Sequence, residues 1–108
     1  MWKSLMLWKT NNKKAKREIK EIEFQDIDIN NCVILDVRSR KEFLEGHINN
    51  SINIPLDTLK KEINKLKKED KIVVCCQSGI RSKKAIKILE NLGFKNLYNL
   101  KGGIENIQ

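Results

Sequence analysis

Apolar residues occur along this chain in short runs that predict buried strands. Residues 32–35 (CVIL) and 72–75 (IVVC) contain no strongly polar position, which is typical of strands covered on both faces of a sheet. Residues 52–54 (INI, directly before Pro55) and 97–100 (LYNL) predict two further short strands.

The segments between these runs have apolar residues at helical spacing. A short helix is expected over residues 40–45, ended by Gly46, and a second is indicated by Leu59, Ile63 and Leu66. The third is the clearest and ends in a capping glycine: Ala85, Ile86, Leu89, Leu92 and Gly93. Strands that alternate with helices require crossover connections, so we expect an α/β fold with a central parallel sheet covered on both faces.

Charge is distributed unevenly along the 108 residues. The formal net charge is +8, but residues 1–20 carry seven Lys or Arg and one Glu, whereas residues 21–108 carry 15 basic and 13 acidic groups. The length suits one domain, which we place at residues 19–108 after a basic N-terminal extension at residues 1–18. The nearly balanced charge of the domain predicts no nucleic-acid partner.

The cysteine content predicts a reducing, cytoplasmic location. Three cysteines, an odd number, occur without a C-x-x-C pair. The extension begins MWKSLMLWK, which is too short to span a bilayer and lacks the cleavage site of an export signal. Cys32, Cys75, Cys76 and His47 are spaced wrongly for a zinc site, so we expect no metal.

The ends of the two strongest strands predict a common site. Open parallel sheets bind ligands beyond the carboxyl ends of their strands, where DVR (36–38) and CCQSGIR (75–81) both fall. The second loop is short, and Gly79 can take a positive φ, so several backbone N–H groups can turn inward beside a helix N-terminus. Such a nest holds an anion, either a substrate oxyanion or the Cys76 thiolate, whose pKa falls near amides and an arginine.

Two blocks of this sequence resemble the single-domain rhodaneses: LDVRSRKEFLEGHINNSINIP (35–55) and VVCCQSGIRSKKAIKILENLGFKNLYNLKGGI (73–104). The resemblance implies a three-layer α/β fold with about five parallel strands and a nucleophile, Cys76, at the head of a loop over residues 76–81. The rest of that loop is Gln77, Ser78, Gly79, Ile80 and Arg81. The family's DxR, E and GH motifs match Asp36, Arg38, Glu42 and His47, which we expect to support the architecture; for His47 we expect a hydrogen bond in a turn.

The doubled cysteine admits two interpretations. Counted from Cys76, four residues precede Arg81, the spacing of rhodanese sulfurtransferases; counted from Cys75, five do, the spacing of tyrosine phosphatases and cell-cycle phosphatases. Gly79 stands third after Cys76, as the sulfurtransferase pattern CxxGxR requires, and this favours Cys76. Cys75 and Cys32 are then expected in the core, as free cysteines commonly are.

The function implied by the resemblance is sulfur transfer. The Cys76 thiolate would take a sulfane sulfur from thiosulfate or a persulfide donor and pass it to a small thiol or a protein acceptor, with no cofactor. Arg81 would attract the anionic donor or form a salt bridge with Asp36 or Glu42. The neutral Gln77 stands where many rhodaneses have a cation. The alternatives are a phosphatase or arsenate reductase that uses Cys75, and a module that carries sulfur or binds a partner without turnover.

The C-terminus departs from the family pattern. Rhodaneses usually continue past GGI with a short helix that bears an aromatic residue, whereas this chain ends ENIQ. We therefore expect a gap in the covering of the core, and we expect Trp2 or Trp8 of the extension to fold back and fill it. The alternative, a contact between the extension and a membrane surface, is not favoured.

Overall fold

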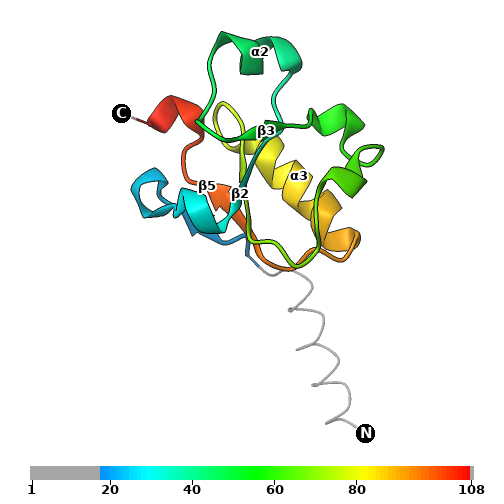
Figure 1. Ribbon diagram of the computed structural model, residues 1–108. Helices are drawn as coiled ribbons and strands as arrows, with labels where there is room; N and C mark the ends of the chain where they lie inside the picture. Colours follow the sequence, from blue (N-terminus) through cyan, green and yellow to red (C-terminus); the bar gives the residue numbers. More distant parts are fainter. Residues whose placement is uncertain (1–17, 108) are drawn as a thin grey trace, which may run out of the picture.

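The computed structural model describes residues 18–107, which form one five-stranded sheet with every strand pair parallel (Figure 1). The strand order is β1-β5-β4-β2-β3. The strands are β1 (Glu21–Ile22), β2 (Val33–Asp36), β3 (Ile52–Asn53), β4 (Ile72–Cys75) and β5 (Leu97–Leu100). The parallel α/β fold predicted from the sequence is therefore confirmed.

The two central strands bring the candidate chemistry to one edge of the sheet. β2 pairs with β4 so that Val33 lies opposite Ile72 and Asp36 lies opposite Cys75. The chain segments that follow these strands, 37–38 and 76–81, consequently leave the sheet side by side at its carboxyl edge, as predicted.

The helices divide between the two faces of the sheet and its carboxyl edge. α3 (Ile80–Asn91) covers one face together with the 3₁₀ turns η3 (Leu56–Thr58) and η4 (Ile63–Lys65). The other face is covered by η1 (Phe24–Asp26), η2 (Ile29–Asn31) and η5 (Ile104–Asn106), and α2 (Arg40–Glu45) lies above the carboxyl edge (Figure 1). Within residues 18–107, no helix has the length and apolarity needed to cross a membrane.

Each face of the sheet has its own apolar core. Alternating strand residues point to opposite faces, so Val74 packs under α3 while its neighbours Val73 and Cys75 pack on the other side. The α3 side is the larger core, with Leu59, Leu66, Ala85, Ile86 and Leu89 among its buried members. The opposite core includes Ile34, Ile48 and Leu100.

The helix expected around Leu59, Ile63 and Leu66 is wrong in type. Residues 56–66 form two separate 3₁₀ segments, η3 and η4, instead of one α-helix. Between them Glu62 takes φ −108° and ψ +19°, which is outside the helical region. The segment contains the poor helix formers Thr58, Ile63 and Asn64. The two leucines nevertheless point into the core, at 0% and 6% exposed, so the apolar spacing reflected burial rather than an α-helix.

The remaining boundaries differ little from expectation. α2 occupies the predicted residues and ends at Gly46, and Ser39 and Glu42 form a capping box at its start. α3 is followed by Gly93, whose φ is +97°. β2 begins one residue after Cys32, which is half-buried and donates to the Asp28 carbonyl, so Cys32 belongs only to the margin of the core.

Gly103 allows the C-terminal segment to contact the nucleophile loop. Its φ is +73°, and a Cβ placed there would lie 2.3 Å from the carbonyl oxygen of Gln77. Directly beyond it, the Ile104 amide donates to the Cys76 carbonyl at 2.8 Å and the Glu105 amide donates to the Gln77 carbonyl at 3.0 Å. The loop is thus held from below by backbone hydrogen bonds.

We expect Gly103→Ala to lower the free energy of unfolding by at least about 2 kcal/mol, since a positive φ and a clash with backbone act together. The control is Gly93→Ala, where φ is also positive but the nearest atoms belong to the movable end of Lys68. It should cost only about 1 kcal/mol. Urea unfolding measures both, and equal losses would contradict the close approach at Gly103.

Candidate active site

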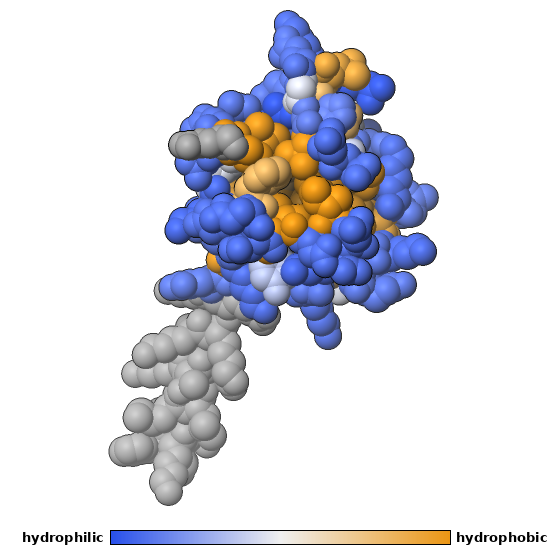
Figure 2. All heavy atoms as spheres, turned by 60° about the vertical axis from the view of Figure 1, so that its left-hand side comes forward, coloured by the Kyte–Doolittle hydropathy of each residue, from blue (hydrophilic) through white to orange (hydrophobic). Residues whose placement is uncertain are grey.

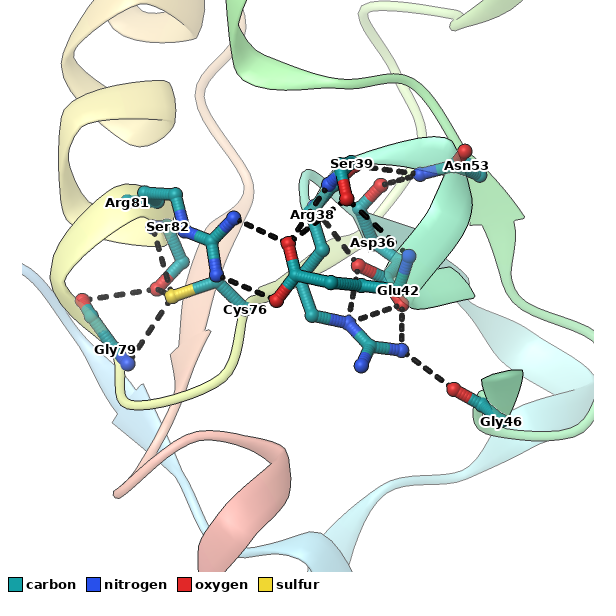
Figure 3. A network of polar contacts seen from close by, with 10 residues as sticks. All are labelled: Asp36, Arg38, Ser39, Glu42, Gly46, Asn53, Cys76, Gly79, Arg81 and Ser82. Carbon is teal, nitrogen blue, oxygen red and sulfur yellow. Dashed lines mark hydrogen bonds and ion pairs between the residues drawn. The ribbon is translucent and has the colours of Figure 1, made fainter. Parts of the chain in front are cut away.

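The Cys76 sulfur lies in a cradle of hydrogen-bond donors at the start of α3. Its Sγ accepts from the Gly79 amide at 3.1 Å and from the Ser82 amide at 3.3 Å, and it lies 3.5 Å from the Ser82 hydroxyl (Figure 3). Gly79 adopts φ +102°, a conformation that side chains disfavour, and thereby turns its N–H back toward the sulfur. The predicted nest is present, and a sulfur atom occupies it.

These donors set the ionisation of Cys76. Burial raises the pKa of the thiol, but hydrogen bonds from the Ser82 side chain and from the amides of Ser82, Gly79 and Ser78 lower it, and the net pKa lies below the ordinary value. The N-terminus of a twelve-residue helix adds its partial positive charge at the same point. The arrangement therefore favours a thiolate without help from a histidine.

Ser82 belongs to a buried polar chain that the sequence did not reveal. Its hydroxyl lies 2.9 Å from the Gly79 carbonyl and also contacts Oδ1 of Asn99, while Nδ2 of Asn99 donates to Glu21 at 3.0 Å. Ser82 and Asn99 are both fully buried. Because Glu21 accepts from Nδ2, the amide oxygen of Asn99 faces Ser82. The signal in the sequence was weak: a single Asn inside the apolar run LYNL.

Cys75 points to the opposite side of the sheet. It is fully buried in the core beneath η5, among Ile34, Val73 and Leu100. Burial, and to a smaller degree the charge of Asp36, raises the pKa of its thiol far above the ordinary value. The last residue of β4 thus places its sulfur among apolar side chains and the next residue places its sulfur among amides, and the core position expected for Cys75 is confirmed.

Arg81 connects the loop to α2. Its Nη1 and Nη2 atoms donate to the two Glu42 oxygens at 2.7 and 3.0 Å. Glu42 Oε1 also accepts from the amide and hydroxyl of Ser39, so one carboxylate closes the capping box and binds the arginine. The Arg81 hydrogen bonds, with its charge and the Ser39 bonds, lower the pKa of Glu42 to about 2 against the cost of burial. Of the two carboxylates considered for Arg81, the structure selects Glu42.

Asp36 instead holds the chain that follows β2. It is fully buried and accepts from the backbone amide of Arg38 at 2.9 Å and from its Nη2 at 2.8 Å. The same Nη2 donates to the Gly46 carbonyl at 2.7 Å, and Asn53 Nδ2 donates to the carbonyls of Asp36 and Arg38 (Figure 3). These bonds fix both ends of α2 relative to the sheet.

The other predicted site residues lie at the margin. His47 Nδ1 is 2.8 Å from the Phe43 carbonyl and its ring stacks on Phe43, which is the turn contact expected of it. The side chains of Gln77, Ser78 and Ile80 are exposed around the loop. Across residues 18–107, no cluster of three or more His, Cys, Asp or Glu is placed to bind a metal ion.

The combination of this sheet and this loop defines a class of protein. The chain belongs to the rhodanese-like domain family, whose family model matches residues 13–108. Among solved structures, a rhodanese-related protein from Thermoplasma volcanium is similar at 36% identity with a TM-score of 0.74, covering 80% of this chain and 87% of that one. An NAD-dependent persulfide reductase from A. fulgidus is 32% identical with a TM-score of 0.68, covering 80% of this chain and 15% of that chain.

Two curated relatives are similar in sequence. The uncharacterized protein YqhL of Bacillus subtilis (strain 168) is 39% identical over 72 residues, which are 67% of this chain and 57% of the relative. The tRNA uridine(34) hydroxylase of Hamiltonella defensa subsp. Acyrthosiphon pisum (strain 5AT) is 39% identical over 79 residues, 68% of this chain and 22% of that protein. The chain therefore spans less than two-thirds of the length of either relative.

Replacing Ser82 should raise the pKa of the Cys76 thiol. Ser82→Ala removes the hydroxyl near the sulfur but keeps the backbone donor, so the thiolate loses one stabilising contact. The pH dependence of alkylation by iodoacetamide should move to higher pH. Ser78→Ala makes the same change at an exposed position of the loop and should leave the profile unchanged; a shift of equal size there would contradict the assignment to the Ser82 hydroxyl.

Glu42→Gln should destabilise the protein in a pH-dependent way. Gln keeps the capping box but loses the charge opposite Arg81, at a cost of roughly 1 kcal/mol near neutral pH for a partly exposed pair. Since the pKa of Glu42 is lowered to about 2 from an ordinary 4.5, the Glu42–Arg81 pair contributes its full stabilisation of the fold at pH values above 4.5. The difference from wild type should shrink as pH falls from 4.5 through about 2. Glu45→Gln, at an exposed position of the same helix, should show no such difference in thermal unfolding.

Proposed function

We propose that this protein is a sulfurtransferase that carries a sulfane sulfur as a persulfide on Cys76. The observation that carries the proposal is the placement of the Cys76 sulfur against the amides of Gly79 and Ser82, with its pKa below the ordinary value. A thiolate held in this way is a nucleophile at neutral pH.

The first step is attack on the outer sulfur of a donor such as thiosulfate. A bond forms between Cys76 Sγ and the outer sulfur, the donor's own sulfur–sulfur bond breaks, and its electron pair leaves with sulfite. The persulfide formed adds one sulfur atom next to the loop. The first amides of an α-helix have no partner within the helix, so those of Ile80 and Arg81 are suited to stabilise the terminal sulfur.

The second step regenerates the enzyme. An acceptor thiolate attacks the terminal sulfur, takes it as its own persulfide, and the electron pair of the broken bond returns to Cys76. Neither step changes the number of protons on the protein, and neither requires a metal or an organic cofactor. Arg81 remains bound to Glu42 and its charge lies beside the loop, where it favours an anionic donor.

The burial of Cys76 restricts which donors react. The residue is only 1% exposed, so its sulfur lies beneath the loop surface. A small donor that presents a single outer sulfur atom can approach along the loop axis, whereas a tetrahedral phosphate needs a wider cradle. This favours sulfur transfer over phosphate chemistry, as does the burial of Cys75 in the opposite core.

The relatives support persulfide chemistry in this family without fixing the reaction of this chain. The A. fulgidus structure is described as a persulfide reductase, and the curated relative from H. defensa as a tRNA hydroxylase. Both are much longer proteins in which the matched region is one part. The acceptor of the sulfur, a small thiol or a protein, is therefore proposed only by chemical class.

Intact-mass measurement after incubation with thiosulfate or inorganic polysulfide should show the gain of one sulfur atom that dithiothreitol removes. Cys76→Ala should abolish the gain because the nucleophile is missing. Cys75→Ala is the matched control: it keeps a small apolar side chain in the core and should still acquire the sulfur.

Two outcomes would contradict the proposal. If Cys76→Ala still gains the sulfur atom and Cys75→Ala does not, the nucleophile is Cys75, and the loop has the residue spacing of the phosphatases. No gain in the wild type with either donor would favour a binding module without turnover.

A further inference from the structure

The face of the sheet opposite α3 contains an open apolar hollow. It has a volume of about 460 Å³ and is lined by Phe24, Ile29, His47, Ile48, Asn49, Ile104 and Ile107. Phe24 and Ile29 are each 37% exposed, which is high for large apolar side chains that face the same depression. Figure 2 shows apolar residues gathered at the centre of this face and surrounded by hydrophilic ones. A cavity of this kind in a folded domain commonly receives a ligand or a chain segment.

The segments around the hollow are acidic. Three exposed carboxylates lie next to lining residues in the sequence: Asp26 and Asp28 between Phe24 and Ile29, and Glu105 between Ile104 and Ile107. The nearby Lys101 pairs with Glu23 at 3.4 Å. Carboxylates therefore border the hollow on the sides formed by η1, η2 and η5.

One segment of this chain matches both properties of the hollow. Residues 1–17 lie outside the described residues and contain six Lys or Arg, no acid, and the apolar set Trp2, Leu5, Met6, Leu7 and Trp8. Their positive charge complements the carboxylates that border the hollow. An indole N–H needs an acceptor when it is buried, and the Asn49 side chain at the wall of the hollow offers an amide oxygen.

The length of the segment is sufficient for an intramolecular contact. Trp8 precedes Glu18 by ten residues, which span up to about 33 Å when extended. A compact domain of this size has a diameter of roughly 30 Å. Phe24, which lines the hollow, follows Glu18 by only six residues.

We propose that residues 1–17 bind to their own domain, with an indole of Trp2 or Trp8 in the hollow formed by Phe24, Ile29, Ile48, Ile104 and Ile107. The apolar side chains enter the hollow, and the lysines lie against the carboxylates that surround it. The contact covers a surface of the core that the described residues leave open, and it does not involve the Cys76 loop.

The two tryptophans of the chain both belong to residues 1–17, so tryptophan emission, excited at a wavelength that Tyr98 does not absorb, reports on this segment alone. The full-length protein should emit at shorter wavelength than a free peptide of residues 1–17 and should be protected from acrylamide quenching. Trp2→Phe and Trp8→Phe then assign the buried indole. The shift should be independent of protein concentration if the contact is intramolecular.

Variants of the hollow provide the decisive comparison. Phe24→Ser/Ile29→Ser should abolish the blue shift, whereas Leu44→Ser/Leu92→Ser, which alters residues 66% and 37% exposed outside the hollow, should preserve it. If the first variant fails to fold, Asp26→Lys/Glu105→Lys changes only exposed carboxylates near the hollow and should weaken the shift at low salt. Deletion of residues 1–12 should lower Tm of the full-length chain.

Several results would overturn the proposal. Emission equal to that of the free peptide, or a shift that survives Phe24→Ser/Ile29→Ser in a folded protein, would remove the hollow as the binding site. A shift that disappears on dilution would assign the hollow to the segment of a second copy. A shift seen only after vesicles containing phosphatidylserine are added would assign the segment to a membrane surface.

Discussion

The turn from β4 into α3 is the constraint on which the rest of this structure depends. Only four residues separate the last residue of a fully buried strand from the first residue of a twelve-residue helix. The chain reverses within that length because Gly79 adopts a positive φ, and the reversal directs amides toward the Cys76 sulfur. Burial by itself would suppress ionisation of the Cys76 thiol. The thiolate is nevertheless stabilised because the hydrogen-bond donors around its sulfur are backbone amides or are held in place by the backbone.

The groups around this turn act by holding it rather than by touching the sulfur. Glu42 binds Arg81 from the cap of α2, and Asp36 binds Arg38 at the carboxyl end of β2. From beneath, the amides of Ile104 and Glu105 bind the carbonyls of Cys76 and Gln77. Two segments far apart in the sequence, around Glu42 and around Ile104, therefore bind one short loop, and the Asp36–Arg38 pair holds the chain that leads into α2. Such over-determination keeps a positive φ and inward-facing amides in place.

The sequence was most informative where physical patterns are local. The apolar run IVVC and the mostly apolar run LYNL predicted β4 and β5 to the residue, and helix spacing with terminal glycines predicted α2 and α3. β1 escaped because two residues of alternating polarity form no run, and its pairing with β5 is a tertiary fact. The segment around Leu59 and Leu66 showed burial at helical spacing without an α-helix, because a 3₁₀ turn can deliver the same side chains.

At the site, too, local spacing predicted residue positions, whereas contacts between distant side chains could not be predicted. The positions of Cys76, Gly79 and Arg81 follow from loop spacing, and the core position of Cys75 follows from its place at the end of a buried strand. The partner of Arg81 could be narrowed only to Asp36 or Glu42, since the choice depends on where α2 sits. The chain from Ser82 through Asn99 to Glu21 joins residues 78 positions apart across three elements, so spacing carries no information about it.

Charge shows why an average over the sequence can conceal a surface property. Residues 21–108 are nearly balanced in composition, and from that balance alone no electrostatic footprint is expected. The fold, however, places the exposed carboxylates of Asp26, Asp28 and Glu105 in the short segments that border the hollow. Balance in the sum is then compatible with a local excess of carboxylates around the hollow, which would attract the basic N-terminal segment. The relevant quantity for its placement is the charge next to the hollow, which only the fold determines.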